Sequence, residues 1–271
     1  MTRLFDPHIH MYSRTTDDYD AMSKAGIEVI VQPSFWLGAP RRFVGTFEDY
    51  WEHMITFETK RAKEFGIEHF ACISVNPKEA AERPLALDAV EAMMKYLDRE
   101  RVVAIGEIGY NLINELEEEI FIKQMDIASE KNMLMTVHLP HNNKPEGIKR
   151  IENILNNDKD SRYDRKEILV DHNVEETIEK TLELGMWAGL SVYPFTKLSP
   201  ERAIRMIKKH GTERIMIHSA ADWGISDPLS VPLVAREMKK SGEFSMHDIE
   251  KVTFYNAYEF FKQSPKFTWK L

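Results

Sequence analysis

Short apolar runs recur along the chain, and a longer amphipathic segment separates each run from the next. Several of the runs are almost continuously apolar, which is typical of parallel strands that are covered on both faces. The pattern predicts eight strands, at residues 4–8, 28–32, 68–75, 102–105, 134–138, 168–171, 187–192 and 214–218.

The segments between these runs carry apolar residues at helical spacing. They predict helices at residues 17–25, 47–65, 86–98, 115–131, 146–156, 175–184, 200–210 and 231–240, with a further helix at 245–261. Glycine stands where four of these helices would end, at Gly26, Gly66, Gly185 and Gly211, as a left-handed C-cap favours. Eight β-then-α units predict an α/β fold of the (β/α)8 TIM-barrel type. A doubly wound open sheet is the alternative, but no G-x-G-x-x-G loop follows the first strand.

The length of the chain agrees with one barrel. It has 271 residues, and a (β/α)8 barrel typically takes about 250. No linker-like or repeated segment divides it, so we expect one domain over residues 1–271. The single cysteine, Cys72, the absence of a signal-peptide pattern and the shortness of the apolar runs predict a soluble, cytoplasmic protein that does not enter a membrane. The net charge of -8 argues against a broad nucleic-acid-binding surface.

Histidines and acids gather at the ends of the predicted strands. They are Asp6, His8 and His10 after the first strand, Glu107 after the fourth, His138 at the fifth, Asp171 and His172 at the sixth, and His218 and Asp222 at the eighth. In (β/α)8 barrels the chemistry lies at the carboxyl ends of the strands. We therefore expect side chains from five strand ends to converge on one small volume.

His8 and His10 are two residues apart, and residues at this spacing on a strand point to the same face. Both imidazoles would project into the barrel mouth and could hold one cation. Neutral imidazole and carboxylate ligands suit Zn, Mn, Fe, Co or Ni. Taken singly, a buried histidine has an ordinary structural explanation, and Glu107 or Asp222 could cap a turn. The metal-site hypothesis depends on their joint occurrence at one rim.

These segments resemble the TatD-related branch of the metal-dependent amidohydrolase superfamily, and the resemblance spans nearly the whole chain. The matching pieces are FDPHIH at 5–10, AIGEIG at 104–109, TVH at 136–138 and VDH at 170–172. The GEIG piece is the most specific, because that branch uses a Glu at the end of the fourth strand to bridge two metals. The resemblance implies a metal-dependent hydrolase with two divalent ions, drawn from Zn, Mn, Mg, Fe, Co and Ni.

The resemblance also implies roles for individual residues. His8, His10 and Asp222 would hold one ion, His138 and His172 would hold the second, and Glu107 would bridge both. A water between the ions would be the nucleophile, and Asp222 would take its proton. Asp222 and Glu107 are therefore the predicted catalytic residues.

This chain departs from the family pattern in two places. The family usually ends strand eight with Glu-Thr-Asp, whereas HSAAD stands here at 218–222, which leaves Asp227 as an alternative to Asp222. The acid that usually follows GEIG closely is replaced by Tyr110 and Asn111. The chain is therefore expected to belong to an outlying branch whose substrate contacts differ.

A long segment, 33–43, follows the second strand and carries Phe35 and Trp36 close to Arg41 and Arg42. Such a combination suits an anionic group joined to a ring, although the aromatic side chains could equally pack beneath the rim. The resemblance favours hydrolysis of a phosphoester from a small molecule or a nucleic acid, including a nuclease or phosphodiesterase reaction. An amide or lactone hydrolase is one alternative. A metal-containing binding protein with little or no catalytic activity is another, because the altered end of strand eight could lack the base.

Overall fold

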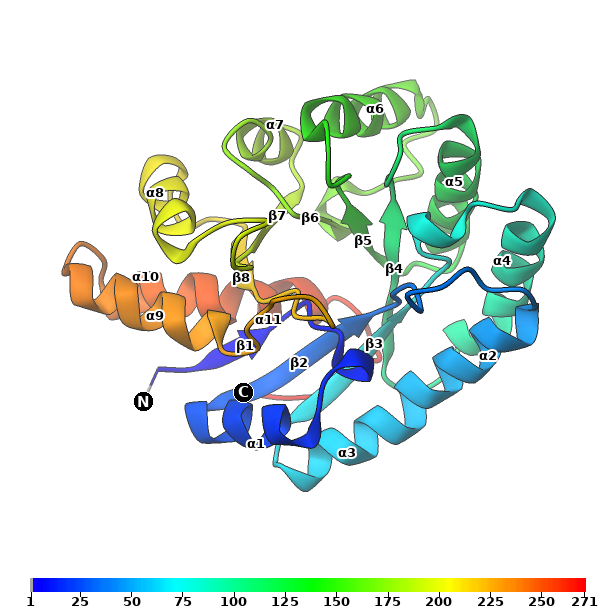
Figure 1. The fold of residues 1–271 in the computed structure, drawn as a ribbon. Coiled ribbons are helices and arrows are strands. Elements are labelled where there is room, and N and C mark those ends of the chain that lie inside the picture. The colour runs from blue at the N-terminus through cyan, green and yellow to red at the C-terminus, as the bar shows by residue number, and fades with distance from the viewer. Residues whose placement is uncertain (1) are drawn as a thin grey trace.

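Eight parallel strands form a barrel in which each strand pairs with the next one along the chain (Figure 1). The computed structural model describes residues 2–271. The strands are β1 Leu4–Asp6, β2 Ile27–Pro33, β3 Glu68–Ile73, β4 Val102–Gly109, β5 Leu134–His138, β6 Ile168–Asp171, β7 Trp187–Ser191 and β8 Ile215–His218. Just beyond the ends of β8 and β1, the backbone N–H of Ala220 donates to the carbonyl of His8 at 2.8 Å. The N–H of His10 likewise donates to the carbonyl of Ala221 at 2.9 Å, so hydrogen bonds join the two edges of a nearly closed barrel, and the predicted (β/α)8 fold is confirmed.

Helices follow the strands and cover the outside of the barrel (Figure 1). They are α1 Thr16–Ala25, α2 Val44–Glu52, α3 Thr59–Glu64, α4 Arg83–Leu97, α5 Glu115–Glu130, α6 Lys144–Asn157, α7 Ile178–Glu183, α8 Pro200–His210, α9 Ser230–Ser241, α10 Met246–Glu250 and α11 Asn256–Phe261. The predicted helices 47–65 and 245–261 each contain a π-helical segment, at His53–Glu58 and Lys251–Tyr255. Within residues 2–271, none of the helices is long and apolar enough to cross a membrane.

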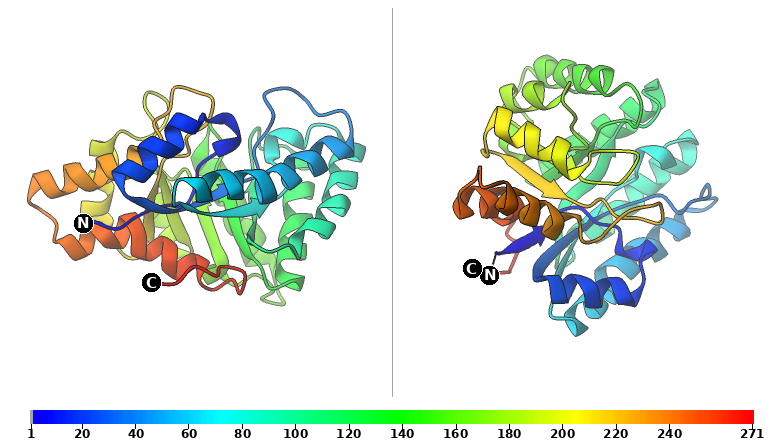
Figure 2. Two further views of the ribbon diagram at one scale, coloured as in Figure 1. Left: turned by 90° about the horizontal axis from the view of Figure 1, so that it is seen from below. Right: turned by 60° about the vertical axis from the view of Figure 1, so that its left-hand side comes forward.

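Apolar side chains fill the barrel and close the end that lies opposite the carboxyl ends of the strands. Alternate strand residues point inward, as barrel geometry requires, and Phe5, Phe70 and Met216 are among them. This inner core continues into the C-terminal segment, where Phe267 stacks on Phe5 with ring centroids 6.0 Å apart. Figure 2 shows the C-terminal segment lying along one end of the barrel. The polar strand ends are thereby left at the opposite, open end.

Among the strand boundaries that differ from the prediction, two at the open end concern candidate ligands. β1 ends at Asp6, so His8 and His10 lie in the segment that follows the strand. β4 continues to Gly109, so Glu107 lies within the strand. The pairing of β4 with β5 also shifts in register near Glu107. The candidate ligands are therefore positioned by irregular backbone at the rim as well as by strand alternation.

Candidate metal centre

The segment after β1 brings two imidazoles together at the barrel mouth. The Nε2 atoms of His8 and His10 are 3.0 Å apart, and both side chains are buried. The carboxylate of Asp6 holds the segment, because it accepts hydrogen bonds from the backbone N–H groups of His8 and Ser219, each at 3.2 Å. His10 Nδ1 donates to the carbonyl of Pro33 at 3.3 Å. A carbonyl can only accept, so Nε2 of His10 presents its lone pair to the mouth.

Glu107 lies at the centre of the cluster. Its Oε1 is 2.9 Å from Nε2 of His172, 3.6 Å from Nε2 of His8 and 3.9 Å from Nε2 of His138. The other carboxylate oxygen, Oε2, accepts a hydrogen bond of 3.0 Å from the side-chain amide of Asn76. Three imidazole nitrogens thus surround one carboxylate oxygen, a ligand set that suits a divalent transition-metal ion.

His138 and His172 reach the cluster in different ways. His138 ends β5, and its Nδ1 donates to the carbonyl of Tyr110 at 2.7 Å, which leaves Nε2 free. His172 directly follows Asp171, and neighbouring residues of an extended strand point to opposite sides. The backbone of His172 is left-handed, with a φ of 62°, and as a result both side chains enter the site.

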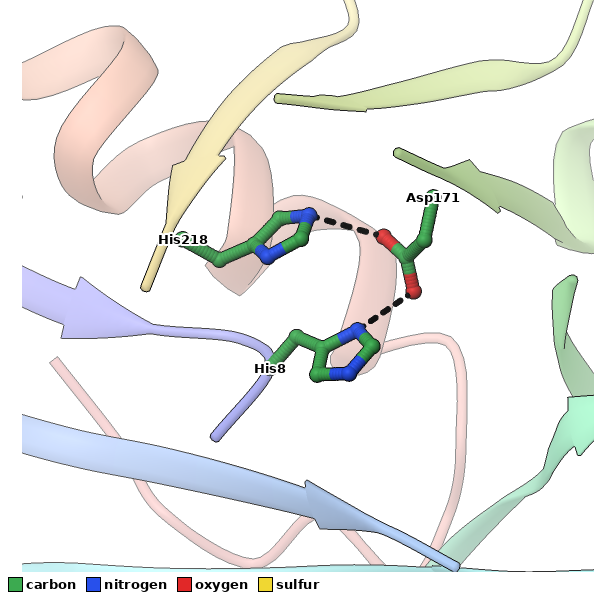
Figure 3. Close-up of side chains that lie close together, drawn as sticks. All are labelled: His8, Asp171 and His218. Carbon is green, nitrogen blue, oxygen red and sulfur yellow. Dashed lines mark hydrogen bonds and ion pairs between the residues drawn. The ribbon is translucent and has the colours of Figure 1, made fainter. Parts of the chain in front are cut away.

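A second layer of contacts lies behind His8. Asp171 Oδ2 accepts a hydrogen bond from His8 Nδ1 at 2.8 Å, and Asp171 Oδ1 is 3.1 Å from Nε2 of His218 (Figure 3). Burial alone would raise the pKa of Asp171, but the two adjacent imidazoles hold it below its usual value. A carboxylate on Nδ1 fixes the tautomer and orientation of a ligating histidine. No role is predicted for Asp171 or His218 from the sequence, and the structure places both against the predicted ligand His8.

Gly189 on β7 leaves the space that this second layer occupies. A Cβ at this position would lie 2.1 Å from Asp171 Oδ1 and 2.8 Å from His218 Nε2. Gly189→Ala is expected to lower stability by about 1–3 kcal/mol through overpacking. It is also expected to weaken metal binding by roughly tenfold or more, because His8 loses its support. Thermal unfolding and a metal titration measure the two effects. Gly45→Ala is the control, since a Cβ there meets nothing within 4 Å. Equal stability and equal metal affinity of the two variants would show that Gly189 does not make room for Asp171 and His218.

The cluster opens into a cavity of 170 Å³. Five of the six predicted ligands contribute to its wall: His10, Glu107, His138, His172 and Asp222. The ring of Phe35 forms another part of the wall and stacks on His10 with centroids 3.9 Å apart. A small molecule, or one end of a larger one, would therefore contact the imidazoles directly.

Asp222 and its alternative, Asp227, occupy different surroundings. Asp222 Oδ1 accepts hydrogen bonds from the hydroxyl of Tyr193 at 2.8 Å and from the backbone N–H of Gly224 at 2.6 Å. Asp227 Oδ1 instead accepts from the backbone N–H of Leu229 at 2.8 Å and thereby caps the turn before α9. Of the two aspartates, Asp222 is the one that lines the cavity.

The buried side chains fit a divalent cation. Within residues 2–271, the ligand atoms of two triplets lie within 4.8 Å of one another, and they are His8–Glu107–His172 and His8–Asp171–His218. Burial lowers the pKa of His8 to about 4 and holds the pKa of His10, His138 and His172 well below the usual value. These imidazoles are therefore neutral at pH 7, as metal coordination requires. Burial also raises the pKa of Glu107 to about 8, and a cation beside the carboxylate would offset that desolvation.

The raised pKa of Glu107 predicts a pH dependence of metal affinity. Below about pH 8 the metal-free carboxyl group holds a proton, which a cation must displace. The apparent affinity is therefore expected to rise by about tenfold per pH unit between pH 6 and 8 and to level off above. Competition with a chelator at several pH values measures this. The histidines are neutral throughout this range, so Glu107→Gln should show a much shallower profile; equal slopes in the two proteins would be the contrary result.

A parallel barrel with histidines and a glutamate converging at its carboxyl end defines a metal-dependent hydrolase of the amidohydrolase type. The family described as TatD related DNase matches residues 5–262 of the chain. This chain therefore belongs to the TatD-related family.

Individual relatives agree with this assignment. An uncharacterized metal-dependent hydrolase from Methanocaldococcus jannaschii is 29% identical over 267 residues, which cover 96% of this chain and 100% of that protein. A TatD-like protein from Archaeoglobus fulgidus has a TM-score of 0.77 at 23% identity and covers 95% of this chain and 99% of its own. A phosphotriesterase homology protein from Escherichia coli, at 16% identity, has a TM-score of 0.67 and covers 96% and 99%. A lactonase from Listeria monocytogenes, at 14% identity, has a TM-score of 0.64 and covers 99% and 95%. At these identities the solved structures share the fold.

Proposed function

We propose that this protein hydrolyses a phosphoester at a centre that holds two divalent ions. The observation that carries the proposal is the pair of lysines in the wall of the cavity that contains the metal ligands. Lys78 and Lys197 line it, and neither is among the lysines that form ion pairs within residues 2–271. These lysines balance the negative charges of Glu107 and Asp222, so two bound ions would give the cavity an excess of positive charge. A phosphate group would compensate this excess, whereas a neutral ester would not.

Lys197 supports an anionic substrate most directly. Its Nζ lies 3.4 Å from Nδ1 of His172, in the β7–α8 loop above the cluster. Burial lowers the pKa of Lys197, and an anion beside it would stabilise its charged form. The structure from Escherichia coli, which shares this fold, is described with phosphate in its active site. That description agrees with an anion at the corresponding end of this barrel.

The residues of the chain have separable tasks in such a reaction. Divalent ions, when bound, supply Lewis-acid stabilisation of the phosphoryl group and activate a water molecule. Glu107 links the two histidine pairs through its central carboxylate. Asp222, held by Tyr193 and the backbone of Gly224, would accept a proton from the attacking water. Lys197 binds and orients the phosphoryl oxygens.

A substrate panel tests the proposal. Protein loaded with Zn²⁺, Mn²⁺ or Mg²⁺ is assayed against phosphomonoesters, phosphodiesters including a single-stranded oligonucleotide, lactones and amides. We expect turnover of at least one phosphoester class and none of the neutral substrates. Turnover confined to lactones or amides would support the alternative hydrolase instead. No turnover of any class by protein with verified metal content would support a metal-containing binding protein.

Lys197→Met is expected to raise KM for the phosphoester by roughly ten- to a hundredfold, because a charge-assisted contact to phosphate is lost. Steady-state kinetics of the metal-loaded variant measure the effect, and elemental analysis shows whether the ions are retained. Lys149→Met on the exposed face of α6 is the control and should leave KM unchanged. A normal KM in Lys197→Met, or a loss of metal that accounts for the whole effect, would remove Lys197 from substrate binding.

A further inference from the structure

A second cavity, of 330 Å³, lies beside the one that contains the metal ligands. The β2–α2 loop, the β3–α4 segment and the first turn of α4 form most of it, and we call it the ring cavity. The apolar part of its wall consists of Trp36, Ala39, Pro40, Ala81 and Leu85. Its volume is in the range of small-molecule sites, which are typically about 300–1,000 Å³.

Lys78 joins the two cavities, because it contributes to the wall of both. Its Nζ lies 4.8 Å from the ring centroid of Trp36 in the ring cavity. Trp36 in turn contacts Phe35, which lines the cavity that contains the metal ligands, and the two ring centroids are 6.4 Å apart. A ligand whose charged group lies among Lys78, Lys197 and the metal ligands could therefore extend into the ring cavity.

Arg41 contributes to the wall of the ring cavity without presenting a free charge there. The sequence pattern suggests that Arg41 clamps an anion, but its Nε donates to Glu79 Oε1 at 2.6 Å and its Nη1 donates to the carbonyl of Thr46. Its side chain is buried, and Nη2 has no hydrogen-bond partner within residues 2–271. The charge of Arg41 is thus neutralised by Glu79, and the residue forms part of the wall of the ring cavity instead of clamping an anion.

We propose that the ring cavity binds the alcohol portion of the substrate, and that this portion is a flat, mostly apolar ring. Lys78, at the junction, contacts the phosphoryl group of the same molecule. This inference rests on the proposed phosphoester hydrolysis and narrows the substrate class to phosphate esters of aryl or arylmethyl alcohols. Apolar walls bind the ring by the hydrophobic effect, and Trp36 offers a face for stacking.

The experiment compares two esters whose leaving alcohols have similar acidity, benzyl phosphate and methyl phosphate, with metal-loaded protein. Binding is measured separately by calorimetry, with benzylphosphonate and methylphosphonate, which are not hydrolysed. Leu85→Trp fills the ring cavity, and Ala39→Phe fills it from an exposed loop position. Leu87→Trp lies on the same helix outside the cavity wall and serves as the matched control.

We expect the unmodified protein to prefer the benzyl compounds by about tenfold or more in kcat/KM and in Kd. The cavity-filling variants should lose most of this preference, and Leu87→Trp should keep it. Equal values for benzyl and methyl compounds in the unmodified protein would overturn the inference, as would an equal preference in Leu85→Trp, Ala39→Phe and Leu87→Trp. Preferential binding of benzylphosphonate without turnover of any ester would support the cavity while refuting the proposed hydrolysis. Equal turnover of both esters would support the proposed hydrolysis while refuting the role of the ring cavity.

Discussion

Glu107→Gln is expected to abolish hydrolysis and to leave the protein without its full complement of metal. The Oε1 atom of Glu107 is the point that three histidine Nε2 atoms share, at 2.9 to 3.9 Å. Gln keeps the size of the side chain and its contact with Asn76 but removes the negative charge. We expect kcat/KM to fall by at least about a thousandfold, since both ions of the proposed centre would depend on this carboxylate.

Elemental analysis, activity and thermal unfolding of the same preparation separate the causes. Metal-free Glu107→Gln should unfold at or above the temperature of the metal-free unmodified protein, because the variant no longer buries an ionisable carboxyl group at this position. Glu107→Asp is the conservative variant, and it should retain part of the metal because it keeps the charge. Full activity with two bound ions in Glu107→Gln would show that the carboxylate is not the bridging ligand.

The barrel and the meeting of five predicted ligands follow from simple periodicity. Nearly continuous apolar runs separated by amphipathic helices indicate parallel strands, and parallel strands in a closed barrel bring their carboxyl ends to one rim. This rule alone predicts that His8 and His138 lie close together. Their distances to Glu107 depend on the rim backbone, where β1 ends earlier and β4 runs further than predicted.

Contacts behind the ligands could not be derived in the same way. Asp171 supports His8 only because the left-handed backbone of His172 lets two consecutive side chains enter the site. His218 reaches Asp171 because Gly189 has no side chain at that point. A glycine inside a predicted strand is a recognised sign of close approach, so Gly189 was the available signal. Asn76 and Lys197 lie beyond strand ends in loops whose conformation periodicity does not define.

For the catalytic aspartate the sequence leaves two alternatives, because Asp222 and Asp227 both follow strand eight. The HSAAD segment places Asp222 four residues after His218, so strand alternation does not determine its direction. The structure distinguishes the pair by hydrogen bonding. Asp222 faces the cavity and is held by Tyr193, whereas Asp227 is used within its own turn.

Asp222→Asn is therefore expected to lower kcat by about 10²–10⁴-fold, the range for loss of a general base. Asn retains an oxygen that can accept from Tyr193 and Gly224, so the loop should keep its conformation. It cannot accept the proton of the attacking water. Elemental analysis should show that the ions bound by the histidines and Glu107 are largely retained, and single-turnover kinetics should show that the chemical step is slowed.

Asp227→Asn is the matched control, because it makes the same change five residues away in the same loop. It should keep kcat within about twofold, since surface changes away from a site have small effects. An unchanged kcat in Asp222→Asn, or a large loss in Asp227→Asn alone, would move the proton acceptor away from Asp222. If Asp222→Asn loses metal in parallel with activity, and added metal restores turnover, Asp222 acts as a metal ligand. If Asp222 acts as the base, added metal does not restore turnover.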